Sequence, residues 1–248
     1  MNTIPCGPSR LLLSHVRIPG SRHRQNLQPC EDSVLLDNDG DYLFCGLADG
    51  QSGAPWGAEG GRACLEAVSG YIRRTGIHSL IHARFPDELP CMFAQAFRRK
   101  LLALAEEKQC PLQDFASTLL AVAVDLKSGA FILLHLGDGC ALSAASDTEP
   151  GILSPPENAL AAHHTWLTTS DNAVAHLRVA FGSLKPGKRL LLLSDGAVCF
   201  CRGRNISWRA KDVLRTGSQQ LLRQLLAQSN PEDDATCILL DCLGQAPS

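Results

Sequence analysis

The segment Leu190-Leu191-Leu192-Leu193-Ser194-Asp195-Gly196 contains four consecutive leucines that stop at an acid followed by glycine. An apolar run without polar alternation predicts a strand that is covered on both faces. Asp195 would then leave the end of that strand, where an ionised carboxylate is costly to bury unless a cation or hydrogen-bond donors meet it. The segment therefore predicts a buried strand that delivers a carboxylate to a site at the edge of a sheet.

Other apolar segments of the chain adjoin acids in the same way: Tyr42–Ala48 before Asp49 and Gly50, Phe131–Leu136 before Asp138 and Gly139, and Ala235–Leu240 after Asp233 and Asp234. Asp32 also precedes a predicted strand. One Asp-Gly pair alone is ordinary turn chemistry. Its recurrence at several strand ends favours a cluster of carboxylates at one sheet edge over a set of unrelated tight turns.

Length and composition limit what can surround such a site. The chain has 248 residues, of which 45% are hydrophobic, so it can bury a sizeable core, and we expect one domain over residues 1–248. A net charge of -2 without a cluster of Lys and Arg argues against a nucleic-acid partner. No apolar run approaches the roughly 20 residues that span a bilayer, and Met1–Arg10 lacks the apolar core of a signal peptide. We expect a soluble cytoplasmic protein without a membrane partner.

The chain contains 11 cysteines without a Cys-x-x-Cys pair. Cys199 and Cys201 would face the same way on a strand and could bind a metal, but no second pair accompanies them at zinc-site spacing. Buried reduced thiols are the favoured interpretation.

The order of the remaining patterns indicates the fold class. Strands are predicted at Leu11–Ile18, Val34–Leu36, Tyr42–Ala48, Leu119–Leu126, Ala130–Leu136, Cys140–Ala144 and Trp166–Thr169. Apolar residues recur at helical spacing over Ala63–Ile72, Phe93–Leu104 and Leu221–Leu226. Polar stretches predict a connector at Pro19–Pro29, a surface excursion at Ser146–His164 that includes His163 and His164, and a solvated face at Arg202–Lys211. Because no β-α-β unit repeats, the pattern predicts an α+β sandwich.

Several carboxylates without paired histidines suit hard cations such as Mg2+ or Mn2+. Two such ions about 3.5 to 4 Å apart are a device for in-line attack on phosphate, because they acidify a water and neutralise the phosphate oxygens.

An ordered set of motifs across the chain resembles the metal-dependent protein phosphatases of the 2C family: Glu31-Asp32, Ala48-Asp49-Gly50, Gly137-Asp138-Gly139, Ser194-Asp195-Gly196 and Asp233-Asp234-Ala235-Thr236. The segment Gly20–Asp32, with His23, is similar to a bacterial branch of that family, as are Phe115–Leu119 and Thr165–Ser170. The resemblance implies a four-layer α-β-β-α sandwich with a central antiparallel β-sandwich, two core Mg2+ or Mn2+ ions, and hydrolysis of phosphoserine or phosphothreonine in proteins by a metal-bridging water.

The resemblance also implies roles for individual residues. Asp49 would bridge the two ions and Gly50 would offer its carbonyl, while Asp195 and Asp233 would complete one ion's shell. Asp32 would act through metal-bound water, and Asp138 matches a position that helps to hold a third ion. Asp49 and Asp195 are therefore the candidate catalytic carboxylates.

Two positions depart from the family pattern. Leu27 stands where many members have an arginine that binds the substrate phosphate, and Gln51 stands where some have a histidine. The cluster Arg22-His23-Arg24 could supply the missing phosphate contact, and we expect His23 rather than Arg24 to do so. The departures leave two alternatives to a protein phosphatase: a catalytically weak regulatory binding module with the same fold, and a phosphatase of small phosphorylated molecules.

Overall fold

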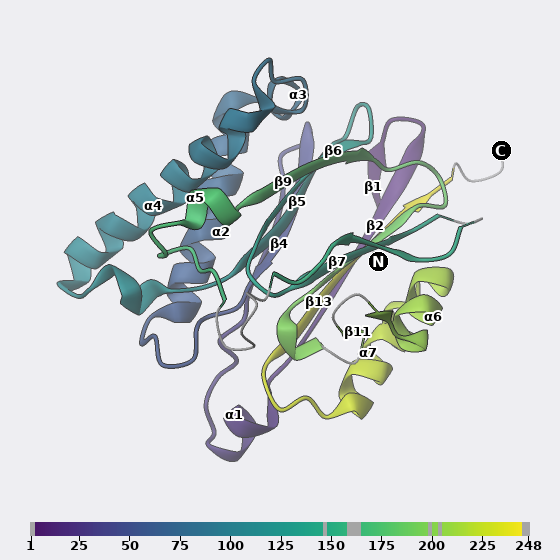
Figure 1. Ribbon diagram of the computed structural model, residues 1–248. Coiled ribbons are helices and arrows are strands. Elements are labelled where there is room, and N and C mark those ends of the chain that lie inside the picture. The colour runs from purple at the N-terminus through teal and green to yellow at the C-terminus, as the bar shows by residue number, and fades with distance from the viewer. Residues whose placement is uncertain (1–2, 146–147, 158–164, 198–199, 203–204, 245–248) are drawn as a thin grey trace.

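The chain forms two antiparallel sheets whose inner faces meet (Figure 1). The computed structural model describes residues 3–145, 148–157, 165–197, 200–202 and 205–244. The larger sheet has the order β1 (Thr3–Cys6), β2 (Ser9–Ile18), β13 (Ala235–Leu243), β10 (Arg189–Leu193), β7 (Cys140–Ala144) and β8 (Gly151–Ser154). The smaller sheet has the order β3 (Ser33–Asn38), β4 (Tyr42–Ala48), β5 (Leu119–Asp125), β6 (Ala130–Leu136) and β9 (Arg178–Ser183). The short strands β11 (Cys201–Arg202) and β12 (Asn205–Ile206) pair with each other.

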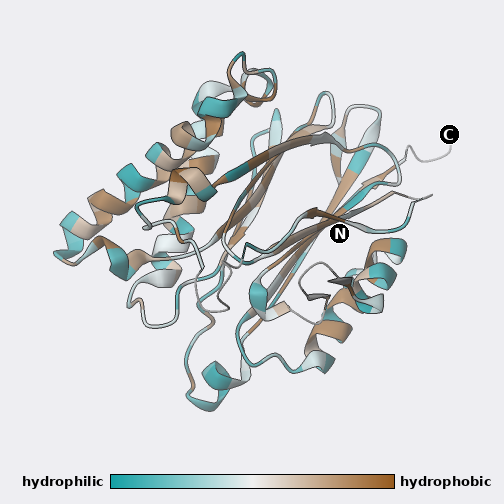
Figure 2. Ribbon diagram, in the orientation of Figure 1, coloured by the Kyte–Doolittle hydropathy of each residue, from teal (hydrophilic) through white to brown (hydrophobic). Residues whose placement is uncertain are grey.

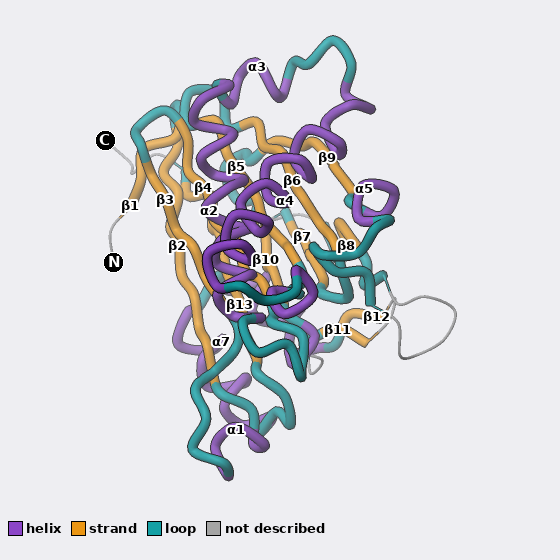
Figure 3. The backbone as a smooth tube through the Cα atoms, turned by 90° about the vertical axis from the view of Figure 1, so that its left-hand side faces the viewer, coloured by secondary structure: helices purple, strands orange, loops and turns teal. Residues whose placement is uncertain are grey.

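Helices cover the outer face of each sheet, so that the described chain has four layers (Figures 1 and 3). The smaller sheet is covered by α2 (Gly57–Thr75), α3 (Ile77–Ile81), α4 (Leu89–Lys108) and α5 (Ala173–His176). The larger sheet is covered by α6 (Trp208–Thr216) and α7 (Gln219–Ser229). Short 3-10 turns lie at η1 (Pro86–Glu88), η2 (Leu112–Phe115) and η3 (Asp195–Ala197). The α+β class and the four-layer sandwich expected from the sequence are confirmed.

Strand β10 lies between β13 and β7, and its leucines show why the strand lacks polar alternation. Leu190 and Leu192 join the core between the two sheets, whereas Leu191 and Leu193 pack against α6 and α7. Both faces of the strand are therefore buried, and Figure 2 shows the strands of both sheets mainly in the hydrophobic colour. The same packing brings Asp195 to the end of the strand, beside the start of β13.

Several segments of the described chain differ from the sequence predictions. Trp166–Thr169 is not a strand: Thr168 N donates to the Ser117 carbonyl at 2.9 Å, and Ser170 N closes a turn by donating to the Leu167 carbonyl at 2.9 Å. Strand β9, at an edge of the smaller sheet, was not predicted, because its partly exposed residues show little alternation of apolar and polar side chains. The segment Pro19–Pro29 contains a short helix, α1 (Ser21–Gln25), and the surface excursion contains β8.

The basic segment Arg202–Lys211 is not wholly a solvated face. Helix α6 begins within it, because the hydroxyl of Ser207 accepts from Ala210 N at 3.4 Å and so caps the helix. Ala210 and Val213 of this helix are buried against the larger sheet. His163, His164 and Cys199 lie outside the described residues, while Cys45 and Cys64 are buried thiols without a disulfide.

Candidate active site

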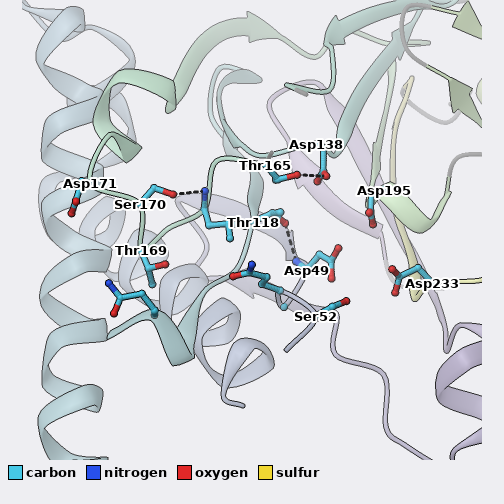
Figure 4. A pocket seen from close by; sticks show the side chains of 14 residues that line it. Asp49, Ser52, Thr118, Asp138, Thr165, Thr169, Ser170, Asp171, Asp195 and Asp233 are labelled. Carbon is cyan, nitrogen blue, oxygen red and sulfur yellow. Dashed lines mark hydrogen bonds between the residues drawn. The ribbon is translucent and has the colours of Figure 1, made fainter. Parts of the chain in front are cut away.

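A pocket of about 530 Å³ lies at the end of the sandwich where the acid-bearing strands start or stop (Figure 4). Asp49 follows β4, Asp138 lies between β6 and β7, Asp195 follows β10, and Asp233 precedes β13. Figure 4 shows these four side chains grouped at one side of the pocket, with Thr169, Ser170 and Asp171 at the other. The structure thus brings together four of the acids that the sequence singled out.

The glycines after three of these acids are required by close packing and not by turn conformation. Gly50, Gly139 and Gly196 are absent from the glycines with positive φ among the described residues. A Cβ on Gly196 would lie 1.9 Å from the Asp234 carbonyl oxygen, and one on Gly139 would lie 2.8 Å from that of Leu193. A Cβ on Gly50 would lie 2.8 Å from Ala58 N at the start of α2. Each Asp-Gly pair therefore lets the backbone of another element pass close to the carboxylate.

Asp32 lies next to Asp49 and Asp195 and is only 1% exposed. The Ser194 hydroxyl donates to its Oδ2 at 3.1 Å, while its Oδ1 is buried without a hydrogen-bond partner. Burial raises the pKa of Asp32 to about 7, and repulsion from Asp234 and Asp195 adds to the effect. Asp32 does not line the pocket, but its carboxylate interacts with that of Asp49.

The central carboxylates destabilise one another's charged forms. Burial, followed by repulsion from Asp32 and Asp195, holds the pKa of Asp49 well above its usual range. Burial likewise raises the pKa of Asp195 to about 6, with repulsion from Asp138 adding to the effect. A cation bound among these carboxylates would lower their pKa values and so favour their ionised forms.

The donor chemistry of the pocket fits divalent cations. Among the described residues, the lining contains five aspartates and no Lys, Arg or His, and Asp195 Oδ1 is buried without a hydrogen-bond partner. Oxygen-only donors are the ligands that Mg2+ and Mn2+ prefer. Within the described residues, however, no three acidic, histidine or cysteine side chains already form a finished metal cage. The fit to divalent cations therefore rests on the identity of the donor atoms and on the buried carboxylate oxygens without hydrogen-bond partners. The aspartate side chains would have to turn towards an ion to bind it.

Hydroxyl groups hold two of the acid-bearing loops in place. Asp49 N donates to Thr118 Oγ1 at 2.9 Å, and Thr165 Oγ1 donates to Asp138 Oδ2 at 2.7 Å. Both threonines line the pocket, together with Ser52, Gln113 and Ser170. Local sequence patterns assign no role to these residues, although Thr118, Thr165 and Ser170 lie in segments that carry the family resemblance.

The structure does not bring His23 to the pocket. Its Nδ1 lies 2.9 Å from Asp234 Oδ1, and Asp234 also accepts from Gly20 N at 2.7 Å and from Glu31 N. The hydrogen bond to Asp234 raises the pKa of His23. His23 thus joins the segment before Asp32 to the residue next to Asp233, which is a positioning geometry and does not match the expected contact with phosphate.

The other candidates for a phosphate contact also lie elsewhere. Arg24 donates to the Pro19 carbonyl and to Asn230 Oδ1, and Arg22 lies 3.6 Å from Glu232. Leu27 is 94% exposed with a φ of 54°, so its side chain points into solvent. Gln51, in contrast, lines the pocket. Among the described residues, the side chains that line the pocket beside the acids are uncharged.

Comparison with known proteins identifies the class. The family model described as protein phosphatase 2C matches residues 19–243. No protein of curated function matches the sequence. Solved structures of low sequence identity share the fold. The serine/threonine phosphatase of S. agalactiae superimposes with a TM-score of 0.65 at 17% identity, over 93% of this chain and 99% of the other.

Two further structures were determined with metal ions. The catalytic domain of the serine/threonine phosphatase PstP, in complex with two manganese ions, gives a TM-score of 0.66 at 16% identity over 94% of this chain and 98% of the other. RsbX in complex with magnesium gives 0.59 at 15% identity over 97% and 98%. The fold and the site define a phosphatase of the metal-dependent class. The chain belongs to the protein phosphatase 2C family.

Proposed function

We propose that this protein is a Mg2+- or Mn2+-dependent phosphatase that hydrolyses phosphoserine and phosphothreonine in protein substrates. The observation that carries the proposal is the pocket itself, where carboxylates from four separate loops meet at the end of the sandwich and no cationic side chain of the described residues lines the pocket beside them. Membership of the protein phosphatase 2C family and structural similarity to serine/threonine phosphatases support the reaction class.

Each acid has a proposed role. Asp49 would bridge two ions with help from the Gly50 carbonyl, and Asp195 with Asp233 would complete the shell of one of them. Asp32 would act through an intervening water, which suits its burial outside the described pocket lining. Asp138, held by Thr165, would bind a more peripheral ion. When bound, such ions would acidify a water and neutralise the phosphate oxygens.

The chain's own groups would orient the substrate. The hydroxyls of Ser52 and Ser170 and the amides of Gln51 and Gln113 line the pocket, and each can donate to a phosphate oxygen or to the peptide backbone. These donors are neutral, so we propose that they orient the substrate phosphate more than they increase its binding affinity. His23 is proposed as a positioning residue that holds the segment before Asp32 through Asp234.

The absence of a basic side chain from the described lining favours one second candidate function. A pocket without a charged phosphate contact would bind substrate less tightly, and the protein could then act as a catalytically weak regulatory binding module. Turnover of a phosphoprotein distinguishes the two candidates, because a binding module would retain affinity for a partner without hydrolysing its phosphate.

Two residues of the pocket provide the test of function. We expect Asp49→Asn and Asp195→Asn to lower kcat/KM for a phosphothreonine peptide more than about 100-fold, since altering groups that only support metal ligands already costs 10–100-fold. Asp87→Asn, on the exposed turn η1, changes charge equally and should leave activity unaltered. Rates are measured with Mn2+, with Mg2+ and after treatment with EDTA, alongside calorimetric titration of each metal.

Full activity after EDTA treatment, or in Asp49→Asn, would reject the metal-dependent assignment. A phosphopeptide panel measured beside small aryl and sugar phosphates tests the substrate class. Preference for the small phosphates would favour a phosphatase of small molecules.

We further propose that the protein acts in the cytoplasm on protein partners and not on nucleic acid. No helix in the described part of the chain is both long and apolar enough to cross a membrane. The buried thiols of Cys45 and Cys64 lie in the core without disulfides, which suits a reducing compartment.

A further inference from the structure

Helices α2 and α4 lie side by side on the outer face of the smaller sheet (Figure 3). A groove of about 370 Å³ lies between their exposed sides. The groove is recessed where small side chains from both helices line it: Ala67, Ala96 and Ala103. Tyr71 and Met92 add larger apolar groups to the lining. Met92 is 38% exposed, which is high for so apolar a side chain. The groove thus offers apolar surface to a ligand outside the active-site pocket.

The groove also carries positive charge that the described chain does not balance. Arg74, Arg99 and Lys100 line it, and no acidic residue does so in the described part of the chain. Within the described residues, no acidic side chain forms a salt bridge with any of these three cations. Neighbouring cations on the same helices differ in this respect: Arg62 pairs with Glu66 at 2.9 Å and Arg73 with Asp37 at 2.6 Å. The three unpaired cations therefore surround an apolar surface.

The dimensions suit a helix. The lining residues on α4 extend from Met92 to Ala103, which corresponds to about 16 Å along the axis, or three helical turns. An amphipathic helix that docks in such a groove inserts side chains spaced three and four residues apart. Acidic residues beside those anchors would meet Arg74 at one end of the groove and Arg99 and Lys100 along α4.

The chain itself does not supply a complementary helix among its described residues. Helix α7 contains one arginine and no acid, and α6 carries Arg209, Lys211 and Arg215 against a single Asp212. A second copy of this chain that docked through α6 or α7 would therefore present the wrong charge. A bilayer surface is also a poor match, because the apolar groups line a recess between two helices and do not project from it.

We propose that this groove is a docking site for an acidic amphipathic helix of a partner protein. The groove is separate from the pocket, so the proposal does not depend on the reaction assigned there. Its helices nevertheless lead to the pocket: α2 begins close to Gly50, and α4 is followed by η2, which contains Gln113. A protein held in the groove would lie on the same chain elements that build one side of the pocket.

A stapled helical peptide tests the proposal. The probe is a fluorescein-labelled peptide of about 14 residues, long enough for three to four turns, with leucines at positions i, i+4 and i+7 and glutamates flanking them. Fluorescence anisotropy gives its Kd for the full chain. We expect the triple variant Arg74→Glu, Arg99→Glu and Lys100→Glu to bind at least about tenfold more weakly. Ala96→Leu, which fills the recess without altering charge, should also weaken binding.

The matched control reverses three unpaired surface cations elsewhere, Arg10→Glu, Lys185→Glu and Arg223→Glu, and so changes the net charge equally. It should alter Kd less than about twofold. Thermal midpoints and aryl-phosphate turnover should match the wild type in all variants.

Equal weakening in the control variant would overturn the proposal, as would wild-type affinity for a lysine-substituted peptide equal to that for the acidic one. Failure of the wild type to bind the acidic peptide would also overturn it. Binding to phosphatidylserine vesicles that depends on the same three cations, without peptide binding, would replace it with a membrane contact.

Discussion

Replacement of Gly196 by alanine tests how the site is assembled. In the structure, an added Cβ would lie 1.9 Å from the carbonyl oxygen of Asp234 and 3.1 Å from that of Asp233. Ordinary contacts of a Cβ begin at 3.4 Å, so the two backbones must separate by about 1.5 Å. Because Asp195 directly precedes this glycine, the substitution moves Asp195 away from Asp233 without removing either carboxylate.

The size of the effect follows from that displacement. Mg2+ requires ligand distances of about 2.0–2.1 Å, so two acids that share an ion cannot both follow a shift of this size. Misplacement by 1 Å can cost about 10²-fold in rate. We therefore expect Gly196→Ala to lower kcat/KM at least about 100-fold and to weaken metal binding, with a loss of unfolding free energy of about 1–3 kcal/mol from overpacking.

Phosphopeptide turnover, metal titration calorimetry and urea unfolding measure the three quantities. Gly151→Ala is the matched control, because no atom lies within 4 Å of an added Cβ there and its φ is not in the left-handed region. Wild-type metal affinity and turnover in a folded Gly196→Ala protein would refute the conclusion that this close approach sets the distance between the two acids.

Two further predictions concern residues that contact and position the acids of the site. His23→Ala should lower the thermal midpoint more at about pH 5.5 than at about pH 8.5, because the pKa of His23 is raised in the folded state. The stabilisation of the folded protein by His23 is complete below the unfolded pKa near 6.5 and is lost as pH rises through the folded pKa. An equal effect at both pH values, or a raised KM with unchanged stability, would argue against a positioning role. Thr165→Val removes the hydrogen bond to Asp138 and should lower kcat while leaving core-metal affinity unaltered, with recovery in Thr165→Ser. Reduced stability without a change in kcat would indicate a purely structural contact.

Local sequence patterns predicted the layers and the acids of this protein well. The leucines of β10 indicated a strand buried on both faces, because consecutive residues of a strand point to opposite faces and all four are apolar. The acids at strand ends were recognisable for a related reason, since a buried apolar run must end before a charged group. Strand β9 escaped prediction because an edge strand with half-exposed residues lacks that signal.

The sequence by itself determined the α+β class, the elements that bury their apolar faces, and the identity of Asp49, Asp138, Asp195 and Asp233 as one set. Only the tertiary structure decided how that set is held. The contact between His23 and Asp234 joins residues 211 positions apart, and the glycine at 196 is needed because the chain at Asp234 passes against it. Local patterns report burial along one segment, whereas the distance between two segments depends on how the whole sandwich packs.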